Sequence, residues 1–304
     1  MLTSRGIIRP LHNGEVVLFS ITSAAYLYLF RKKDELPKSI SSALKYVVGS
    51  AEAPPELNAN DVKNTKTKSA KLKPEFLRLL LGRLQQTPKH RLCQHHHGCL
   101  HYVLQGFCRQ FGLGYVIQTV VKFLSHLPKI PFQPSILLHI FFNKDSLSLG
   151  AFLGCYSAIF KAVNCVLRWF RDRDDSVHGL VAGFLAGWSM MMYKSSVIAL
   201  YAATKLGELL YFKGIKAGVL PYIKCADIVI YSISTAFAFH AAVLEPHNLR
   251  PAYWKFLLRV TGNRFAQMNR RLVDVFGTNA SKLYPDYWPN YDMRFTSLNP
   301  LDFS

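Results

Sequence analysis

The chain has 304 residues, half of them hydrophobic, and a formal net charge of +19 from 37 Lys and Arg against 18 Asp and Glu. This positive excess excludes an acidic disordered chain and indicates contact with nucleic acid or with an anionic membrane surface. The mean hydropathy of +0.11 hides a mixture, because long uncharged runs alternate with strongly basic stretches. The six cysteines are too few and too scattered for a disulfide scaffold, so we expect them to be reduced.

An uncharged run at residues 16–30 is the first structural feature, and three consecutive basic residues follow it. A secretory signal peptide would carry small residues at a cleavage site there instead. The run therefore predicts a membrane anchor within residues 1–33. Because it is short for a membrane span, a buried helix of a soluble core is the alternative.

Residues 34–92 form a basic segment with two adjacent prolines and many lysines and serines. This composition predicts a flexible linker. Binding of single-stranded nucleic acid would require aromatic residues between the charges for stacking, and none occurs between Val47 and Glu75. We therefore expect the linker to lie near anionic lipid headgroups, and we expect no nucleic acid partner.

Cysteines and histidines gather at the start of residues 93–145, ahead of a semi-apolar helix. The simplest interpretation is a solvated, partly titrating loop without a cofactor. Zinc is the sharper alternative, although the Cys-x5-Cys spacing is wider than in most zinc knuckles. A pH- or redox-sensitive interface is the third interpretation. The zinc ligands under the second interpretation are Cys93, His95, His97 and Cys99.

Four runs with few formal charges occupy a predicted transmembrane module at residues 146–245. They are residues 146–167, 176–193, 195–212 and 226–244. Each has about the length that a helix needs to cross a hydrocarbon core, roughly 20 residues. Helices of soluble proteins carry a polar stripe, and the second run carries none. The fold class that we predict is an all-α membrane protein: a glycine-faced four-helix transmembrane bundle with an N-terminal anchor helix and amphipathic helices.

The tail at residues 246–304 mixes apolar and basic residues. Residues 253–276 place Trp254, Leu257 and Phe265 among five Lys and Arg residues. This pattern is typical of an amphipathic helix that rests on a membrane surface. The alternative is a soluble domain helix that packs on its own loops.

Small residues recur at every fourth position in three of the four runs. Helix association in lipid relies on close backbone approach, which small residues permit. The spacing therefore predicts closely crossing helices and is also compatible with self-association. The residues are Gly150, Gly154 and Ala158 in the first run, Gly179, Gly183 and Gly187 in the second, and Ala199, Ala203 and Gly207 in the third.

Ionisable residues lie in or near these runs, where hydrocarbon makes them costly. They are Lys161, Lys205, Glu208, Asp227 and His240. Lys205 and Glu208 are three residues apart and can neutralise each other on one helix face. We interpret the group as internal pairs and keep a polar pathway for a solute as the alternative.

A pattern across the first two runs carries a family resemblance. It reads Ser157-x2-Phe160-x10-Arg171-x3-Asp175-x6-Ala182-Gly183-x3-Gly187. The pattern resembles the signature of the preprotein and amino acid transporter family, which includes the channel-forming subunits of mitochondrial inner-membrane translocases. That signature has Gly or Ala where this chain has Ser157. We expect Arg171 and Asp175 to form an ion pair that fixes two helices at the interface and to have no role in transport.

Longer blocks resemble the C-terminal part of the transmembrane protein 135 family, also described as peroxisomal membrane proteins. They are residues 11–30, 150–175, 182–196, 210–235 and 249–259. The resemblance implies a multi-pass protein of peroxisomal and mitochondrial membranes and of lipid droplets. It also implies roles in peroxisome organisation, the balance of mitochondrial fission and fusion, and lipid homeostasis, with fission or peroxisome-biogenesis proteins as partners. Members of that family carry further N-terminal membrane segments, so a short form or an incomplete sequence is expected.

These patterns lead to two functional hypotheses. The first is a membrane scaffold or regulator that binds anionic headgroups through its basic segments. The second is a transporter or channel-like translocase subunit that moves a solute or polypeptide through the glycine-packed bundle. The sequence has no Gly-x-Ser-x-Gly, P-loop, Gly-x-Gly-x-x-Gly or His-Glu-x-x-His motif, so we expect no enzymatic activity.

Overall fold

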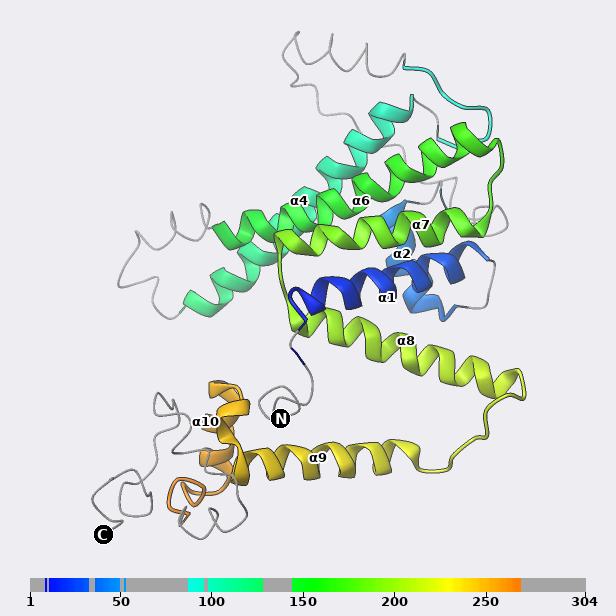
Figure 1. Cartoon of the computed structure of the whole chain (residues 1–304). Coiled ribbons are helices and arrows are strands. Elements are labelled where there is room, and N and C mark those ends of the chain that lie inside the picture. Colours follow the sequence, from blue (N-terminus) through cyan, green and yellow to red (C-terminus); the bar gives the residue numbers. More distant parts are fainter. Residues whose placement is uncertain are drawn as a thin grey trace. The chain divides into compact units, whose positions relative to one another are not determined.

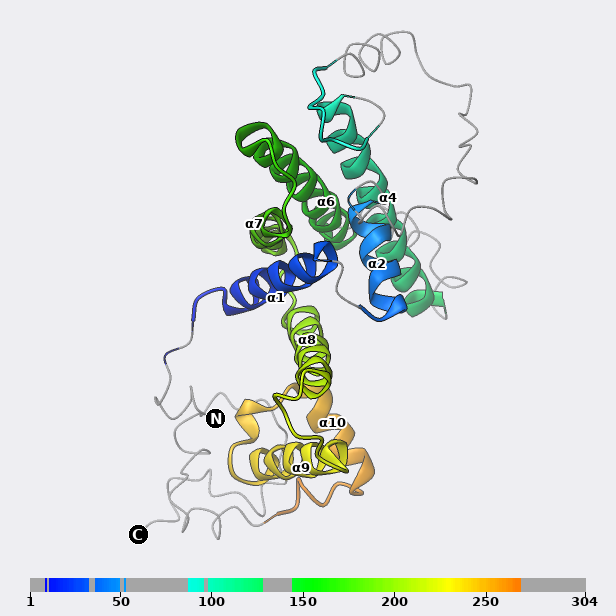
Figure 2. The same ribbon diagram turned by 90° about the vertical axis from the view of Figure 1, so that its right-hand side faces the viewer.

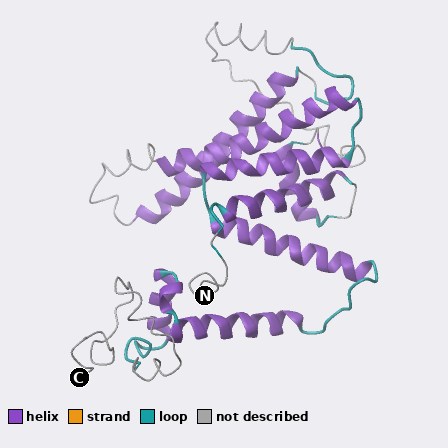
Figure 3. Ribbon diagram, in the orientation of Figure 1, coloured by secondary structure: helices purple, strands orange, loops and turns teal. Residues whose placement is uncertain are grey.

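A computed structural model describes residues 9, 11–32, 36–49, 52, 87–95, 98–127 and 144–268. All regular elements within these residues are helices, which confirms the all-α prediction for the described part of the chain (Figures 1 and 3). The chain divides into two compact units, which we describe separately. The larger unit comprises residues 12–219, and the smaller comprises residues 1–11 and 220–304.

The larger unit is a layered arrangement of helices around α6. Its elements are α1 (Gly14–Arg31), α2 (Lys38–Val48), α4 (Cys99–His126), α6 (Lys144–Arg171), α7 (Ser176–Gly187), the 3₁₀ helix η4 (Trp188–Met192) and α8 (Ser196–Lys216). α6 packs along α4 on one side and α7 on the other, α7 packs along α1, and α1 contacts α8 (Figures 1 and 2). Leu27, Val48 and Phe160 are fully buried where α1, α2 and α6 meet.

The turn between α6 and α7 places these two helices side by side. Asp172 adopts a left-handed backbone conformation with φ of 45°, which ends α6. Asp175 is extended and precedes the first turn of α7. The chain reverses within four residues, so the C-terminal end of α6 and the start of α7 share one end of the unit.

The packing partners differ from the predicted bundle of four consecutive runs. The first two runs correspond to α6 and α7, but their close neighbours are α4 and α1. The fourth run is α9 (Ala226–Leu244), which belongs to the smaller unit. Hydropathy locates apolar helices but does not determine which faces meet, and the glycine faces of α6 and α7 meet α4 and α1 instead.

The predicted N-terminal anchor is a central helix of the larger unit. α1 spans nearly the expected residues, but its polar side chains Ser20, Thr22 and Ser23 are buried against its neighbours. α1 is therefore an internal helix of this unit, and its role as a membrane anchor stays a prediction.

Part of the predicted linker is helical. α2 buries Val48 completely and packs on α6. Glu52, four residues later, is also buried. The apolar residues of α2 recur at helical spacing, which the neighbouring lysines and serines obscure. Most of the linker, including the lysines at 63–73, lies outside the described residues.

The smaller unit contains α9, the 3₁₀ helix η5 (Pro246–Asn248) and α10 (Pro251–Val260). The tail helix is shorter than predicted, because Gly262 and Asn263 adopt left-handed conformations that end it. Phe265 then turns back onto Trp254 and onto Phe239 of α9. Residues 269–276 of the predicted helix lie outside the described residues.

Two of the described helices, α6 and α9, are long and apolar enough to cross a membrane, and the apolar segment Ser176–Met192 is shorter. The mean hydropathy of the best window is 1.5 in α6 and 1.6 in α9. Half of the α6 window but only 11% of the α9 window is buried.

Candidate functional site

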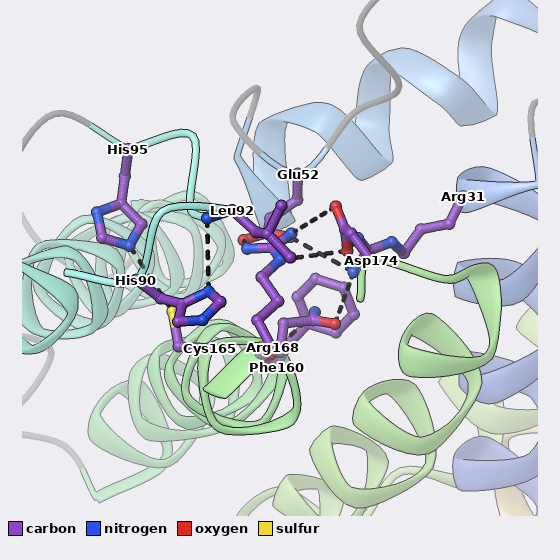
Figure 4. Close-up of polar contacts among 10 residues, drawn as sticks. Arg31, Glu52, His90, Leu92, His95, Phe160, Cys165, Arg168 and Asp174 are labelled. Atoms are coloured by element: carbon purple, nitrogen blue, oxygen red, sulfur yellow. Dashed lines mark hydrogen bonds and ion pairs between the residues drawn. The ribbon is translucent and has the colours of Figure 1, made fainter. Parts of the chain in front are cut away.

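Four charged side chains meet at the end of α6, next to the turn into α7 (Figure 4). Arg168 donates to both carboxylate oxygens of Glu52, at 2.7 and 3.2 Å, and its Nε donates to Asp174 at 3.2 Å. Arg31 from α1 also pairs with Asp174, and its Nη1 donates to the Asn164 side chain at 2.6 Å. Three separate parts of the chain therefore converge on one ion network.

The centre of the network is buried, and its two positive and two negative side chains balance in charge. The side chains of Arg168 and Glu52 are each 1% exposed. Bidentate arginine–carboxylate pairs have favourable geometry, and a buried pair is costly to break because it leaves one charge unpaired. The network therefore fixes the end of α1, the segment after α2 and the end of α6 relative to one another.

The residues of the family pattern surround this network. Phe160 and Ala182 are fully buried in the core. The Ser157 hydroxyl is buried and has no hydrogen-bond partner among the described residues. Arg171 and Asp175 lie 3.9 Å apart, with both side chains nearly half exposed. Arg168, which the pattern does not contain, is the buried arginine at this helix end, and it pairs with Asp174 of the turn.

Gly179, Gly183 and Gly187 line the contact between α7 and α1. A Cβ atom on Gly187 would lie 2.4 Å from the Cα of Ser20, and one on Gly183 would lie 2.9 Å from the Ser23 carbonyl oxygen. The Ser23 hydroxyl donates to the Gly183 carbonyl at 2.9 Å. The backbones of α1 and α7 therefore touch directly, without room for a solute.

Gly150 and Gly154 face α4 in the same manner. A Cβ on Gly150 would lie 3.0 Å from the Phe111 carbonyl, and one on Gly154 would lie 3.0 Å from the Phe107 ring. Ala158 is half-buried on the same helix.

The small residues of the third run differ from one another in their surroundings. Ala199 is buried and Ala203 is half-buried, but Gly207 is exposed and has no atom within 4 Å of a Cβ position.

The ionisable residues proposed for a polar pathway belong to three helices, α6, α8 and α9. Lys161 is buried with its Nζ 4.2 Å from the centre of the Tyr102 ring. Lys205 and Glu208 form a 2.6 Å ion pair on α8, with both side chains about half exposed. Asp227 and His240 belong to α9 in the smaller unit.

Cys93, His95 and Cys99 lie together with Cys165 of α6, and one donor atom of each lies within 4.8 Å of the others. His97 lies outside the described residues. A hydrogen bond with Cys165 lowers the pKa of Cys93 far below that of a free thiol, and His95 and Arg168 act in the same direction. The thiolate is the form of cysteine that binds metals.

A groove runs along α1, α2 and α8 of the larger unit. A cavity of about 250 Å³ lies between these helices and α6, lined by apolar residues such as Phe19, Leu44 and Phe152. A wider cavity of about 920 Å³ shares Tyr26 and Leu44 with it and reaches the Lys205–Glu208 pair. We refer to both cavities together as the α8 groove.

Two of the most buried site residues, Glu52 and Cys165, were not identified from the sequence. Glu52 is an isolated acid in a segment that resembles a linker, and Cys165 lies in an apolar run where a thiol behaves as a small hydrophobe. The cluster of charges that follows α6 was the available signal for Arg168 and Asp174.

Residues 99–205 match the sequence model of the Tim17/Tim22/Tim23/Pmp24 family. The match covers α4, α6, α7, η4 and the first half of α8, and it contains the whole pattern from Ser157 to Gly187. No solved structure matches the chain. The match confirms the translocase-like resemblance of this module, which α1 and α2 complete from outside the matched residues.

Proposed function

We propose that this chain is a multi-pass organelle membrane protein with a translocase-like module, which moves a solute or a polypeptide across its membrane. The match of residues 99–205 to the Tim17/Tim22/Tim23/Pmp24 family carries the proposal. The length and apolar composition of α6 and α9 support a membrane location. The mitochondrion is the organelle that this function favours.

The route that we propose follows the α8 groove and does not pass between α7 and α1. The α7–α1 contact is too close to admit a substrate, since Gly187 lies directly against Ser20. The groove offers apolar walls for an apolar segment and a polar pair, Lys205 and Glu208, at its side. An ionisable pair beside an apolar route can contact a charged group of the substrate as it passes.

Transport by reconstituted protein tests this proposal. Liposomes that contain the full chain should take up either a small fluorescent solute or a labelled basic polypeptide, whereas empty liposomes should not. The double variant Lys205→Ala/Glu208→Ala should lower uptake severalfold.

The matched control is Lys122→Ala/Asp145→Ala, which removes a partly exposed 2.7 Å ion pair that does not line the groove. Uptake by this control should equal that of the unmodified chain. Equal uptake by both double variants would rule out the α8 groove as the route, and uptake no greater than in empty liposomes would rule out translocation of these substrates.

A membrane scaffold or regulator is the second candidate, and the direct packing of α7 on α1 favours it. Under this candidate the resemblance to the transmembrane protein 135 family assigns the chain to peroxisomal and mitochondrial membranes and lipid droplets. Its roles would be in peroxisome organisation, mitochondrial fission and fusion, and lipid homeostasis. The basic segments would bind anionic lipids and fission or peroxisome-biogenesis proteins.

Restoration in cells separates the two candidates. In cells that lack the protein, the variant Lys205→Ala/Glu208→Ala should restore peroxisome number and the mitochondrial network if the chain is a scaffold. The same variant should fail to restore them if transport through the α8 groove is the function.

A further inference from the structure

We propose that Cys93, His95, Cys99 and Cys165 bind one Zn²⁺ ion in a closed structural site. These residues come from the loop before α4, from the first residue of α4 and from α6. Three of them are buried and Cys99 is half-buried. A metal there would join the loop to α6, in a part of the unit where the described loop has no regular secondary structure.

The donor geometry suits zinc. In a tetrahedral site with Zn–S of about 2.3 Å and Zn–N of about 2.0 Å, neighbouring donor atoms lie about 3.5 to 3.8 Å apart. The Sγ of Cys165 and the Nε2 of His95 are 3.8 Å apart, and all four donors lie within 4.8 Å of one another. Three thiolates and one imidazole are a usual donor set of structural zinc sites, which have no open position.

Neighbouring side chains hold the ligands in place. The His95 ring stacks on Tyr102 of α4, with ring centres 4.6 Å apart and an angle of 15° between the ring planes. This contact fixes the imidazole plane while its Nε2 lies near Cys165 (Figure 4). Fixing the ring of a histidine ligand by its surroundings is a common feature of metal sites.

The loop that carries two of the ligands is closed at its base. A Cβ atom on Gly98 would lie 1.9 Å from the Thr87 hydroxyl and 2.6 Å from the Thr87 carbonyl oxygen, so only glycine fits there. The backbone N–H of Cys93 donates to the His90 carbonyl at 3.0 Å, which turns the chain toward α6. The close contact between Gly98 and Thr87 and the turn at Cys93 therefore hold Cys93 and His95 in position.

The charges around the site complement a zinc–thiolate centre. Zn²⁺ with three thiolates carries one net negative charge. The buried residues beside it carry one net positive charge, because Lys161 and Arg168 outnumber Glu52. The two charges cancel, which lowers the cost of burying either group.

Metal analysis of the purified full chain tests the site. After any affinity tag is removed, the chain should contain one equivalent of zinc by elemental mass spectrometry. Replacement of zinc by Co²⁺ should give the intense visible absorption of tetrahedral cobalt with thiolate ligands. The variant Cys165→Ser should lose most of the zinc and most of that absorption.

The matched control is Cys155→Ser, which removes a cysteine of the same helix that lies outside the cluster. It should keep one zinc. Because Cys165→Ser can also disturb packing, Cys165→His keeps a donor at the same position and should retain zinc with weaker binding.

Three results would overturn the proposal. One is a monodisperse wild-type chain that neither contains zinc nor binds Zn²⁺ or Co²⁺. Another is full zinc content in Cys165→Ser, which would place the metal on the loop alone. The third is an iron–sulfur chromophore or a disulfide between two of the four residues in the protein as purified.

Discussion

The two halves of α6 meet their neighbours by different means. In the first half, Gly150 and Gly154 bring the backbone of α4 close, as the glycines of α7 do for α1. In the last turns, Asn164 and Arg168 join an ion network with α1 and the segment after α2. Small residues suit an apolar solvent, where only close contact favours association, and buried ions suit a helix end where several chain segments converge. Close packing therefore sets the distance of α6 from α4, and ion pairs orient the last turns of α6.

Arg168→Ala tests the charged half and should have the largest effect. It leaves the carboxylate of Glu52 buried without its bidentate partner, so we expect a loss of about 3–5 kcal/mol in the free energy of unfolding. Chemical unfolding in detergent, followed by circular dichroism, measures it. Glu52→Gln in the same background should recover part of the loss, and a loss below about 1 kcal/mol would contradict a buried pair.

Removal of zinc tests the proposed metal site beside the ion network. A ligand at a hundred times its Kd stabilises the folded state by about 2.7 kcal/mol, so chelation should lower the melting temperature. Readdition of Zn²⁺ should restore it. The melting temperature of Cys165→Ser should not respond to the chelator, and an equal response in that variant would contradict the assigned ligands.

Gly187→Ala tests the packed contact between α7 and α1. The new methyl group would lie 2.4 Å from the Cα of Ser20, so the helices must separate. We expect destabilisation by about 1–3 kcal/mol in the same unfolding assay.

Gly207→Ala is the matched control, because open space surrounds that position on α8. Alanine favours a helix over glycine, so this variant should be more stable by about 0.5–1 kcal/mol. Destabilisation of similar size in both variants would show that close packing of α7 on α1 is not the cause of the effect.

Arg171→Ala should have the smallest effect, and it tests the exposed ion pair that lies three residues after Arg168. Its pair with Asp175 is 3.9 Å long and nearly half exposed, and such pairs contribute at most about 1 kcal/mol. A change near zero is the expected result of the unfolding measurement. A loss equal to that of Arg168→Ala would mean that the family pattern, and not the buried network, holds the helices.

The sequence predicted the positions of the helices better than it predicted which helices pack together. The run at 226–244 coincides with α9, and the first run lies within α6, because hydropathy and length determine apolar helices locally. That α1 packs on α7 depends on the match between Ser20 and Gly187, which are far apart in the chain. α2 was missed because its exposed lysines and serines resemble a linker.

The candidate site was predictable only where its residues are neighbours in sequence. Cys93, His95 and Cys99 form a local cluster, and the structure places them together. Cys165 and Glu52 have no local signal, since each acquires its role from a helix that arrives from elsewhere in the fold. Only the tertiary contacts of the folded chain bring Cys165 and Glu52 into the candidate site.

The contact between α1 and α7 also constrains how the protein is made. α1 ends at Arg31, and its Ser23 hydroxyl donates a hydrogen bond to the carbonyl oxygen of Gly183 in α7. The ribosome therefore completes α1 long before it synthesises α7. The ion pair between Arg31 and Asp174 likewise forms only after Asp174 has been added to the chain. A nascent chain halted after α4 would hold α1 without its final surroundings, so assembly of this unit is a late event of biosynthesis.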